Sequence, residues 1–292
     1  MGTTVSITIV DAPPTAIEMA TSLVRDLHRR WTRFDLDSEI GRLNQANGAL
    51  VVLEPDTFDV ISAAISAFHN TNGSFDPTVA TSMRAAGYDR DLEQLSNGVF
   101  GHEFEPAPGC SGIELLPDIY GVVMPPGVEI DLGGIGKGAA ADLVAAAVMG
   151  LGAAGVCINL GGDVTVKGIS PTSDPWTIEL VPTAQAGRDP LVVRLNDGAV
   201  CTSRTDLRKW DSPTGPRHHI VDPTSGAPVP TTIVSVSVLA TNAISAEPLT
   251  KAALVAGPRH ARSVLSAAGV PAVIGTFDGS LHAVGNIREY LR

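Results

Sequence analysis

The sequence predicts an α+β fold with largely antiparallel sheets and packed helices, and its length allows either one large domain or two. Segments with apolar residues three and four positions apart, typical of helices, are mixed with strand-like segments in no strict order. A parallel sheet would require a regular alternation of strand and helix, which this chain lacks. From residue 155 to 240 the pattern is mostly strand, and no shift in composition marks a linker between domains.

The N-terminal half contains two predicted helices. A strand over residues 1–10 precedes the first, and the second follows Pro55 and ends in the polar residues 70–73. Residues 91–127 contain five prolines and predict irregular chain with at most short strands. The apolar face of the first helix comprises Ile17, Ala20, Val24, Leu27 and Trp31.

The C-terminal half begins with a predicted strand over residues 128–132, a glycine loop and an alanine-rich helix over 139–149. Its end predicts two helical segments and then a hairpin that turns at Asp278 and Gly279. The clearest later strands are 155–160, 176–181, 191–195 and 234–238; the helical segments are 246–256 and 258–268; the hairpin is 272–284.

Charge and composition exclude several classes of protein. With 31 acidic and 20 basic residues the formal net charge is −11, which argues against nucleic-acid binding. With 44% hydrophobic and 17% charged residues the chain can bury a core. Its three cysteines form no disulfide framework or zinc knuckle, and the start of the chain has no secretory signal, so we expect a cytoplasmic protein. The uncharged stretch 143–162 is interrupted by glycines and predicts a buried helix and strand, not a transmembrane segment.

The segment 129–138 is the most informative for chemistry. Its glycines allow a ligand to approach the backbone, and Lys137 adds positive charge at a helix start that suits a phosphate. The alternative is a tight turn from strand to helix with Asp131 as its cap. The segment is not a Walker A loop, although Gly134, Gly136 and Ala139 satisfy the relaxed dinucleotide fingerprint.

Three further polar turns carry candidate residues. Residues 159–163 contain a second glycine pair, for which a hairpin turn is the favoured interpretation. Asp76, in the turn 74–78, either caps the turn or binds a ligand. The histidines at 218 and 219 precede Asp222 and form a metal site, an acid/base site or a structural turn. Arg204, Arg208 and Arg217 nearby favour an anion-facing patch.

Glu247 and Lys251 stand four residues apart at the start of a predicted helix. A Glu-Lys pair at this spacing is ordinarily a surface ion pair, which is the default expectation here.

Taken together, these segments resemble the ApbE family, the FAD:protein FMN transferases once called thiamine biosynthesis lipoproteins. The resemblance spans nearly the whole chain, and so many short motifs in the right order are hard to obtain by chance. They lie at residues 1–3, 34–44, 73–79, 131–138, 159–162, 202–203, 219–226 and 246–247.

The resemblance implies a single T-fold-like domain over residues 1–292 that binds FAD with a divalent metal, normally Mg²⁺. It implies transfer of the FMN moiety to a Thr or Ser hydroxyl of an acceptor flavoprotein, with release of AMP. By the family's pattern Met1 and Phe34 line the FAD site, and His219 lies near the phosphates or the transfer step. The residues that the pattern assigns to holding the cofactor are Ser74, Phe75, Asp76, Asp131 and Lys137.

The expected metal ligands depart from the family's pattern. The resemblance implies a backbone oxygen at Gly134, an Asp where this chain has Glu247, and a Thr where it has Lys251; Thr250 stands one place early. Glu can still bind Mg²⁺, but a lysine ammonium cannot. Either the ammonium takes over part of the metal's charge-neutralising role, or the metal shifts, or the activity is altered.

Three functions remain as hypotheses. The first is FMN transfer, in which Asp76, Asp222 or His219 is the base for the acceptor hydroxyl. The second is FAD binding, or hydrolysis of FAD to FMN and AMP, without protein flavinylation. The third, a nicotinamide-dependent dehydrogenase, is the weakest, because no acidic residue follows the fingerprint at the expected distance of about 20 residues. The expected location is cytoplasmic, where the enzyme can also act at the membrane on a membrane-bound acceptor.

Overall fold

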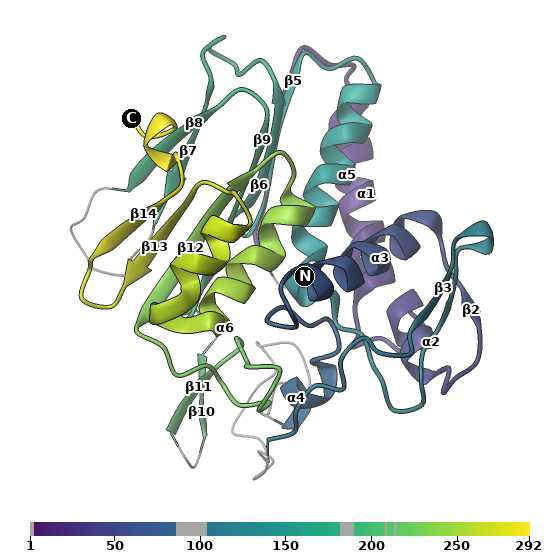
Figure 1. Cartoon of the computed structure of the whole chain (residues 1–292). Helices are drawn as coiled ribbons and strands as arrows, with labels where there is room; N and C mark the ends of the chain where they lie inside the picture. Colours follow the sequence, from purple (N-terminus) through teal and green to yellow (C-terminus); the bar gives the residue numbers. More distant parts are fainter. Residues whose placement is uncertain (1–2, 86–103, 182–189, 208, 213–214) are drawn as a thin grey trace. The chain divides into compact units, whose positions relative to one another are not determined.

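The computed structural model describes residues 3–85, 104–181, 190–207, 209–212 and 215–292 (Figure 1). The chain divides into two compact units. Unit 1 comprises residues 1–2, 28–136 and 205–230, and unit 2 comprises residues 3–27, 137–204 and 231–292. Both units are therefore built from segments that lie far apart in the sequence.

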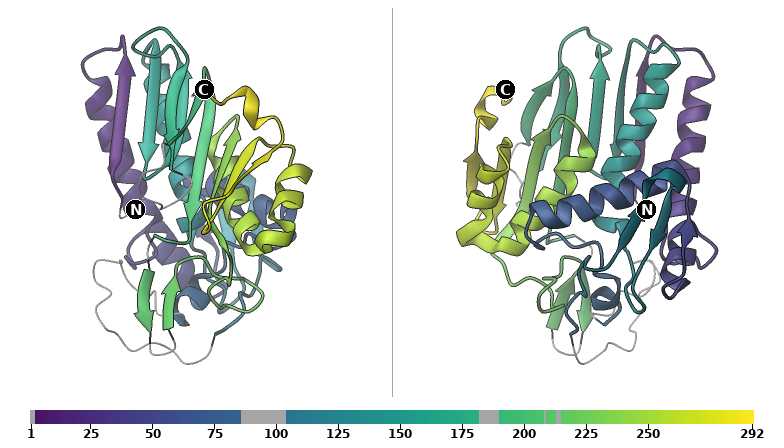
Figure 2. Two further views of the ribbon diagram at one scale, coloured as in Figure 1. Left: turned by 90° about the vertical axis from the view of Figure 1, so that its left-hand side faces the viewer. Right: turned by 45° about the vertical axis from the view of Figure 1, so that its right-hand side comes forward.

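Unit 2 contains a seven-stranded sheet in which every neighbouring pair is antiparallel. The strand order is β1-β5-β6-β9-β12-β13-β14, so strands from the beginning, middle and end of the chain lie side by side (Figure 2). The strands are β1 Val5–Val10, β5 Gly155–Leu160, β6 Asp163–Gly168, β9 Gly198–Arg204, β12 Ile233–Ala240, β13 Ala272–Thr276 and β14 Leu281–Val284.

A second hairpin, β7 (Trp176–Leu180) and β8 (Leu191–Leu195), packs on this sheet. Alternate residues of β7 are buried, as expected for a strand with one face on a core. Trp176 and Ile178 join a hydrophobic cluster with Val164, Val200 and Val273 of the main sheet. This cluster fills the space between the hairpin and the sheet.

Three helices belong wholly or mainly to unit 2: α1 (Ala16–Trp31), α5 (Gly136–Gly150) and α6 (Ala243–Ala267). Helix α6 contacts β12 and β9. Gly257 interrupts α6 with φ 71° and ψ 179°, a conformation that favours glycine, so the helix consists of two segments. The two predicted helical segments are confirmed.

Unit 1 contains helices α2, α3 and α4, the three-stranded sheet β2-β4-β3 and the hairpin β10-β11. Helix α3 begins with Pro55, whose fixed φ suits the first turn, and buries Phe58 and Ile61. The bounds are α2 Glu39–Gln45, α3 Pro55–Asn70, α4 Ala80–Ala85, β2 Val51–Val52, β3 Glu114–Leu116, β4 Gly121–Val123, β10 Lys209–Ser212 and β11 Gly215–His218.

The α+β class with antiparallel sheets and packed helices is confirmed. The prediction of one domain over residues 1–292 stays a prediction. None of the helices in the described part of the chain combines the length and apolar character of a membrane span. The cytoplasmic location stays a prediction.

The strand predicted over residues 128–132 is wrong. The backbone N–H and C=O of Ile130 bond to the side-chain amide of Asn44, and the N–H of Asp131 donates to the Pro77 carbonyl. These backbone groups are therefore satisfied by a side chain and a loop, and the chain passes directly into a 3₁₀ turn over Leu132–Gly134.

Candidate functional site

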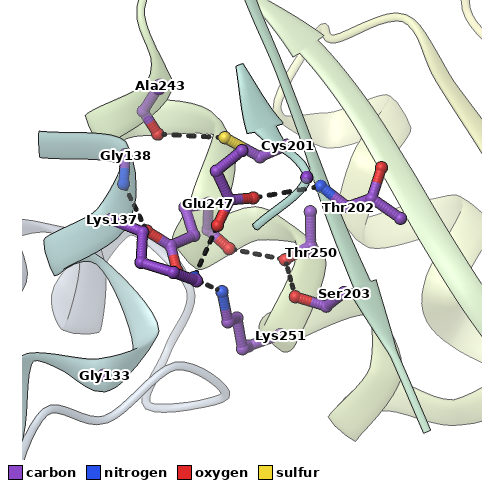
Figure 3. A network of polar contacts seen from close by, with 12 residues as sticks. Gly133, Lys137, Gly138, Cys201, Thr202, Ser203, Ala243, Glu247, Thr250 and Lys251 are labelled. Atoms are coloured by element: carbon purple, nitrogen blue, oxygen red, sulfur yellow. Dashed lines mark hydrogen bonds and ion pairs between the residues drawn. The ribbon is translucent and has the colours of Figure 1, made fainter. Parts of the chain in front are cut away.

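Four charged side chains of unit 2 form a buried group, here called the ion-pair cluster: Lys137, Asp163, Glu247 and Lys251. Figure 3 labels Lys137, Glu247 and Lys251 of this group. Glu247 has no exposed surface, Asp163 is 1% exposed, and the two lysine side chains are 13% and 14% exposed. The default expectation that Glu247 and Lys251 form a surface ion pair is therefore wrong.

Both oxygens of the Glu247 carboxylate are occupied. Oε1 accepts hydrogen bonds from the Lys137 ammonium and, at 2.8 Å, from the Lys251 ammonium. Oε2 accepts the backbone N–H of Gly138 at 2.8 Å. Glu247 thus binds two cations and one amide through a single carboxylate.

The second carboxylate of the cluster, Asp163, follows the turn between β5 and β6. Its Oδ2 lies 2.5 Å from Lys137 Nζ, and its Oδ1 accepts the N–H of Thr202 at 3.2 Å. The turn residues Gly161 and Gly162 have φ of 67° and 96°, which confirms the predicted hairpin turn. The role of Asp163 is missing from the sequence-based site, because the hairpin interpretation accounts for the glycines without it.

Asp142 of α5 positions the start of α6. Its carboxylate accepts the N–H groups of Ala243 and Ile244 at 3.0 and 2.9 Å, where a negative charge compensates the unpaired amides of a helix N-terminus. The helices approach closely at Gly138, because a Cβ there would lie 2.6 Å from the Ala243 carbonyl oxygen. This close approach brings the Gly138 N–H to Glu247.

The pKa values of the cluster follow from burial and mutual attraction. Burial would raise the pKa of Glu247, but the ammonium groups of Lys137 and Lys251 outweigh it and lower this pKa to about 2. Burial would lower the pKa of Lys137, but Asp163 and Glu247 raise it above its ordinary value. Burial raises the pKa of Asp163 and lowers that of Lys251, each opposed by its oppositely charged neighbours.

Thr250, the residue one place before Lys251, is engaged elsewhere. Its hydroxyl donates to the Glu247 carbonyl oxygen at 2.6 Å, and its Oγ1 lies 2.6 Å from Ser203 Oγ. The side chain is fully buried. Thr250 therefore makes one hydrogen bond within α6 and one between α6 and β9.

In unit 1 the predicted turn around Asp76 is closed by hydrogen bonds. Asp76 Oδ1 accepts the N–H and the hydroxyl of Thr78 at 2.7 and 2.6 Å, and Thr78 Oγ1 accepts the N–H of Gly109. Burial raises the pKa of Asp76, opposed by these bonds from Thr78. The capping interpretation of Asp76 is confirmed; its ligand-binding role stays a prediction.

The glycine loop of unit 1 lies against Phe75. A Cβ on Gly134 would lie 2.8 Å from the Phe75 ring, so only glycine fits without movement of that side chain. Asp131 accepts the N–H of Gly133 at 2.7 Å, which confirms the predicted cap. It also accepts from Arg33 Nε at 2.9 Å, and the Arg33 guanidinium lies 4.3 Å from the centroid of the Phe34 ring.

The structure therefore groups Phe34 with Asp131, and Phe75 with Gly134. Ser74 is half-buried beside Phe75. Arg33 links Asp131 to Phe34. The sequence does not predict this role of Arg33, because Arg33 and Asp131 are 98 residues apart and no local pattern indicates their contact. Met1 lies outside the described residues.

The histidine turn has a structural part. Asp222 accepts the N–H of Thr224 at 2.9 Å, and His218 Nε2 lies 3.2 Å from the Val229 carbonyl oxygen. His219 is half-buried. Of the predicted anion-facing arginines, Arg204 donates to the Val181 carbonyl oxygen and Arg217 lies over the Phe104 ring, while Arg208 lies outside the described residues. The anion-facing role stays a prediction.

The residues around Glu247 do not fit a bound Mg²⁺. Mg²⁺ requires about six oxygens in near-octahedral geometry. Here the two Glu247 oxygens already accept three hydrogen bonds. Two of these hydrogen bonds come from ammonium groups, which would repel a dication. Among the residues that the structure describes, no group of three or more His, Cys, Asp or Glu side chains could hold a metal ion.

Sequence comparison identifies the relatives of this chain. The sequence model described as the ApbE family matches residues 1–274. This chain is similar to proteins named FAD:protein FMN transferase from three bacteria. It is 26% identical to the one of Vibrio cholerae, 26% to that of Treponema pallidum and 29% to that of Rhodobacter capsulatus. These matches cover 96%, 76% and 91% of this chain, but 86%, 66% and 51% of the respective relatives.

Solved structures have the same fold. The ApbE protein of Thermotoga maritima superposes with a TM-score of 0.84 at 25% identity, covering 99% of this chain and 95% of that one. The flavin transferase ApbE of Vibrio cholerae superposes with a TM-score of 0.82 at 24% identity, covering 100% of this chain and 96% of that one.

Proposed function

The chain belongs to the ApbE family, and on this premise we propose that it transfers the FMN moiety of FAD to a Thr or Ser hydroxyl of an acceptor protein. The observation that carries the proposal is the family match over residues 1–274. The relatives named FAD:protein FMN transferase and the shared fold of ApbE flavin transferases support it.

The proposed reaction breaks the phosphoanhydride bond of FAD and forms a phosphoester bond to the acceptor. The acceptor hydroxyl oxygen attacks the phosphorus of the FMN half of FAD and forms a new P–O bond. The bond from that phosphorus to the oxygen bridging the two phosphates breaks, AMP leaves with the bridging oxygen, and the hydroxyl proton passes to a base. Such a transfer requires positioning and charge stabilisation more than covalent chemistry from the protein.

Several residues are proposed to hold FAD. Phe34 and Phe75 offer ring surfaces, and Phe75 packs so closely on Gly134 that the loop backbone lies against the ring. The remaining proposed contacts are Met1, Ser74, Asp76, Asp131, Lys137 and His219.

Positive charge for the phosphates is proposed to come from Lys137 at the start of α5. Its raised pKa keeps the ammonium protonated at neutral pH. However, two carboxylates already contact this ammonium, so the charge that faces a ligand is smaller than that of an isolated lysine. The Lys251 ammonium beside it supplies a second positive charge.

His219 and Asp76 are the proposed catalytic residues, and His219 is the stronger candidate for the base. Asp76 Oδ1 already accepts two hydrogen bonds from Thr78, which suits a positioning role better than proton transfer. A neutral imidazole can accept a proton near neutral pH.

A second candidate function is hydrolysis of FAD to FMN and AMP without an acceptor. The occupation of Glu247 by Lys251, where the resemblance implies a metal-ligand pair, favours it. The same bond to phosphorus breaks, with water in place of the acceptor hydroxyl. Because the residues at Glu247 do not fit Mg²⁺, no step of either reaction is assigned to a metal.

The test incubates the purified chain with FAD and the proteins of the source cells. Denaturing gels scanned for flavin fluorescence and mass spectrometry of the fluorescent band detect covalent FMN. We expect a fluorescent acceptor with FMN on a Thr or Ser. Flavin that is lost on denaturation would contradict the transfer.

Neighbouring histidines provide a matched pair of variants for the same assay. His219→Ala is expected to lower the transfer rate at least tenfold, because it removes the proposed base. His218→Ala, which removes the contact with the Val229 carbonyl, is expected to retain the wild-type rate. Equal rates in the two variants would exclude His219 as the base.

A further inference from the structure

We propose that the Lys251 ammonium occupies the place at which a divalent cation would bind Glu247, so that this site works with a built-in cation and without a metal. The claim that the site excludes a metal depends only on the residues of this chain. The claim that FMN transfer needs no metal rests on the proposed function.

The first argument is geometric. Lys251 lies one helical turn after Glu247 on α6, and its Nζ is 2.8 Å from Glu247 Oε1. The same oxygen accepts from Lys137, and the other oxygen accepts the Gly138 N–H. A metal at this carboxylate would have to displace an ammonium that is covalently attached to the same helix.

The second argument is charge balance. The ion-pair cluster places two ammonium groups against two carboxylates, Asp163 and Glu247. A dication added to this group would leave two uncompensated positive charges in a buried place. Buried charge without a partner is strongly unfavourable, so the cluster as built disfavours a metal.

The third argument concerns the oxygen atoms that could still bind a metal at Glu247. An ammonium has no lone pair, so Lys251 cannot itself be a ligand. The nearby hydroxyl of Thr250 is bound to the Glu247 carbonyl and to Ser203. The side chains of residues 250 and 251 therefore offer no free oxygen to a metal at Glu247.

The consequence is a cation that is present before any ligand arrives. A tethered ammonium requires no metal from solution, and it remains when chelators are added. Binding of FAD and FMN transfer are therefore expected to be unchanged, within twofold, between excess Mg²⁺ and excess EDTA.

The direct test measures binding of Mn²⁺ alone, as a paramagnetic probe, by the loss of its free six-line signal. Wild type is compared with Lys251→Thr, Lys251→Gln and the control Lys167→Thr, a lysine of β6 outside the ion-pair cluster. Both Lys251 variants remove the ammonium and introduce an oxygen. Lys251→Gln also keeps most of the stem, which protects the test if Lys251→Thr folds poorly.

We expect at least tenfold tighter Mn²⁺ binding in a Lys251 variant than in wild type, and wild-type behaviour in Lys167→Thr. Equal binding in wild type and the Lys251 variants would overturn the proposal. Absence of binding in all of them would also overturn it, because the ammonium would then not be what keeps the metal out.

The assay separates this inference from the proposed function, because Mn²⁺ binding is measured without FAD or acceptor. A second readout is the FAD affinity from quenching of flavin fluorescence. It is expected to be independent of Mg²⁺ in wild type and to become Mg²⁺-dependent in Lys251→Gln. A wild-type affinity that falls tenfold in EDTA would contradict the built-in cation, whether or not FMN is transferred.

Discussion

At the scale of single residues, Glu247 holds the ion-pair cluster together. It is fully buried and accepts hydrogen bonds from both lysines. Removing one partner of a buried ion pair leaves uncompensated charge. Glu247→Ala is therefore expected to lower the free energy of unfolding by about 3–5 kcal/mol in urea titrations.

The matched control for this prediction is Glu179→Ala. Glu179 lies on the exposed face of β7 in the same unit, so its change should stay within about 0.5 kcal/mol. Equal, small changes in the two variants would show that Glu247 is not a buried charge partner.

Glu247 also predicts a pH dependence of stability. Its pKa falls from 4.5 to about 2 on folding, so its stabilising contribution is complete above about pH 5 and is lost as the pH falls towards 2. From pH 6 to pH 3 wild type should lose more unfolding free energy, by up to about 2 kcal/mol, than Glu247→Gln. Parallel losses in the two proteins would contradict the lowered pKa.

The sequence identifies Lys137, Glu247 and Lys251 as candidates, but not their common environment. The spacing of Glu247 and Lys251 predicts an exposed pair, because local pattern does not report that Lys137, 110 residues earlier, reaches the same carboxylate. Asp163 and Asp142 are missed for the same reason. Their partners are distant backbone amides and a lysine on another element.

At the scale of elements, the interruption of α6 depends on Gly257. Its φ of 71° with ψ of 179° is a conformation that a residue with a Cβ rarely adopts, although a Cβ there meets no atom within 4 Å. Gly257→Ala is expected to lower the free energy of unfolding by about 1–3 kcal/mol through backbone strain alone.

Gly150, at the end of α5, is the matched control. A Cβ there also has open space, and its φ is not positive. Gly150→Ala is therefore expected to raise the free energy of unfolding by about 0.5–1 kcal/mol. The same sign for both substitutions, measured by urea unfolding, would contradict the account of the interruption.

Element prediction succeeds where the pattern is local. The amphipathic spacing of α1, the proline start of α3 and the hairpin turn at Asp278 and Gly279 each predict what the structure contains. The failed strand at 128–132 has apolar residues of the right kind, but Asn44 takes the hydrogen bonds that a strand partner would provide. The local pattern of residues 128–132 does not report a hydrogen bond to Asn44, which lies 86 residues earlier.

At the scale of the whole molecule, the fold class is predictable and the strand order is not. The order β1-β5-β6-β9-β12-β13-β14 pairs the N-terminal strand with one about 150 residues later. Such a pairing depends on which apolar faces bury each other, which a single sequence does not encode locally. The ordered motifs of the resemblance supply this missing information, and the family match confirms the resemblance.

The central claim is transfer of FMN from FAD to an acceptor hydroxyl, and the ratio of AMP released to FMN covalently bound tests it most directly. The ratio is measured in one reaction, by chromatography of the nucleotides and mass spectrometry of the acceptor. Transfer predicts one AMP for each FMN attached to a Thr or Ser, with no free FMN. AMP and free FMN in equal amounts, with an unmodified acceptor, would contradict transfer and establish hydrolysis.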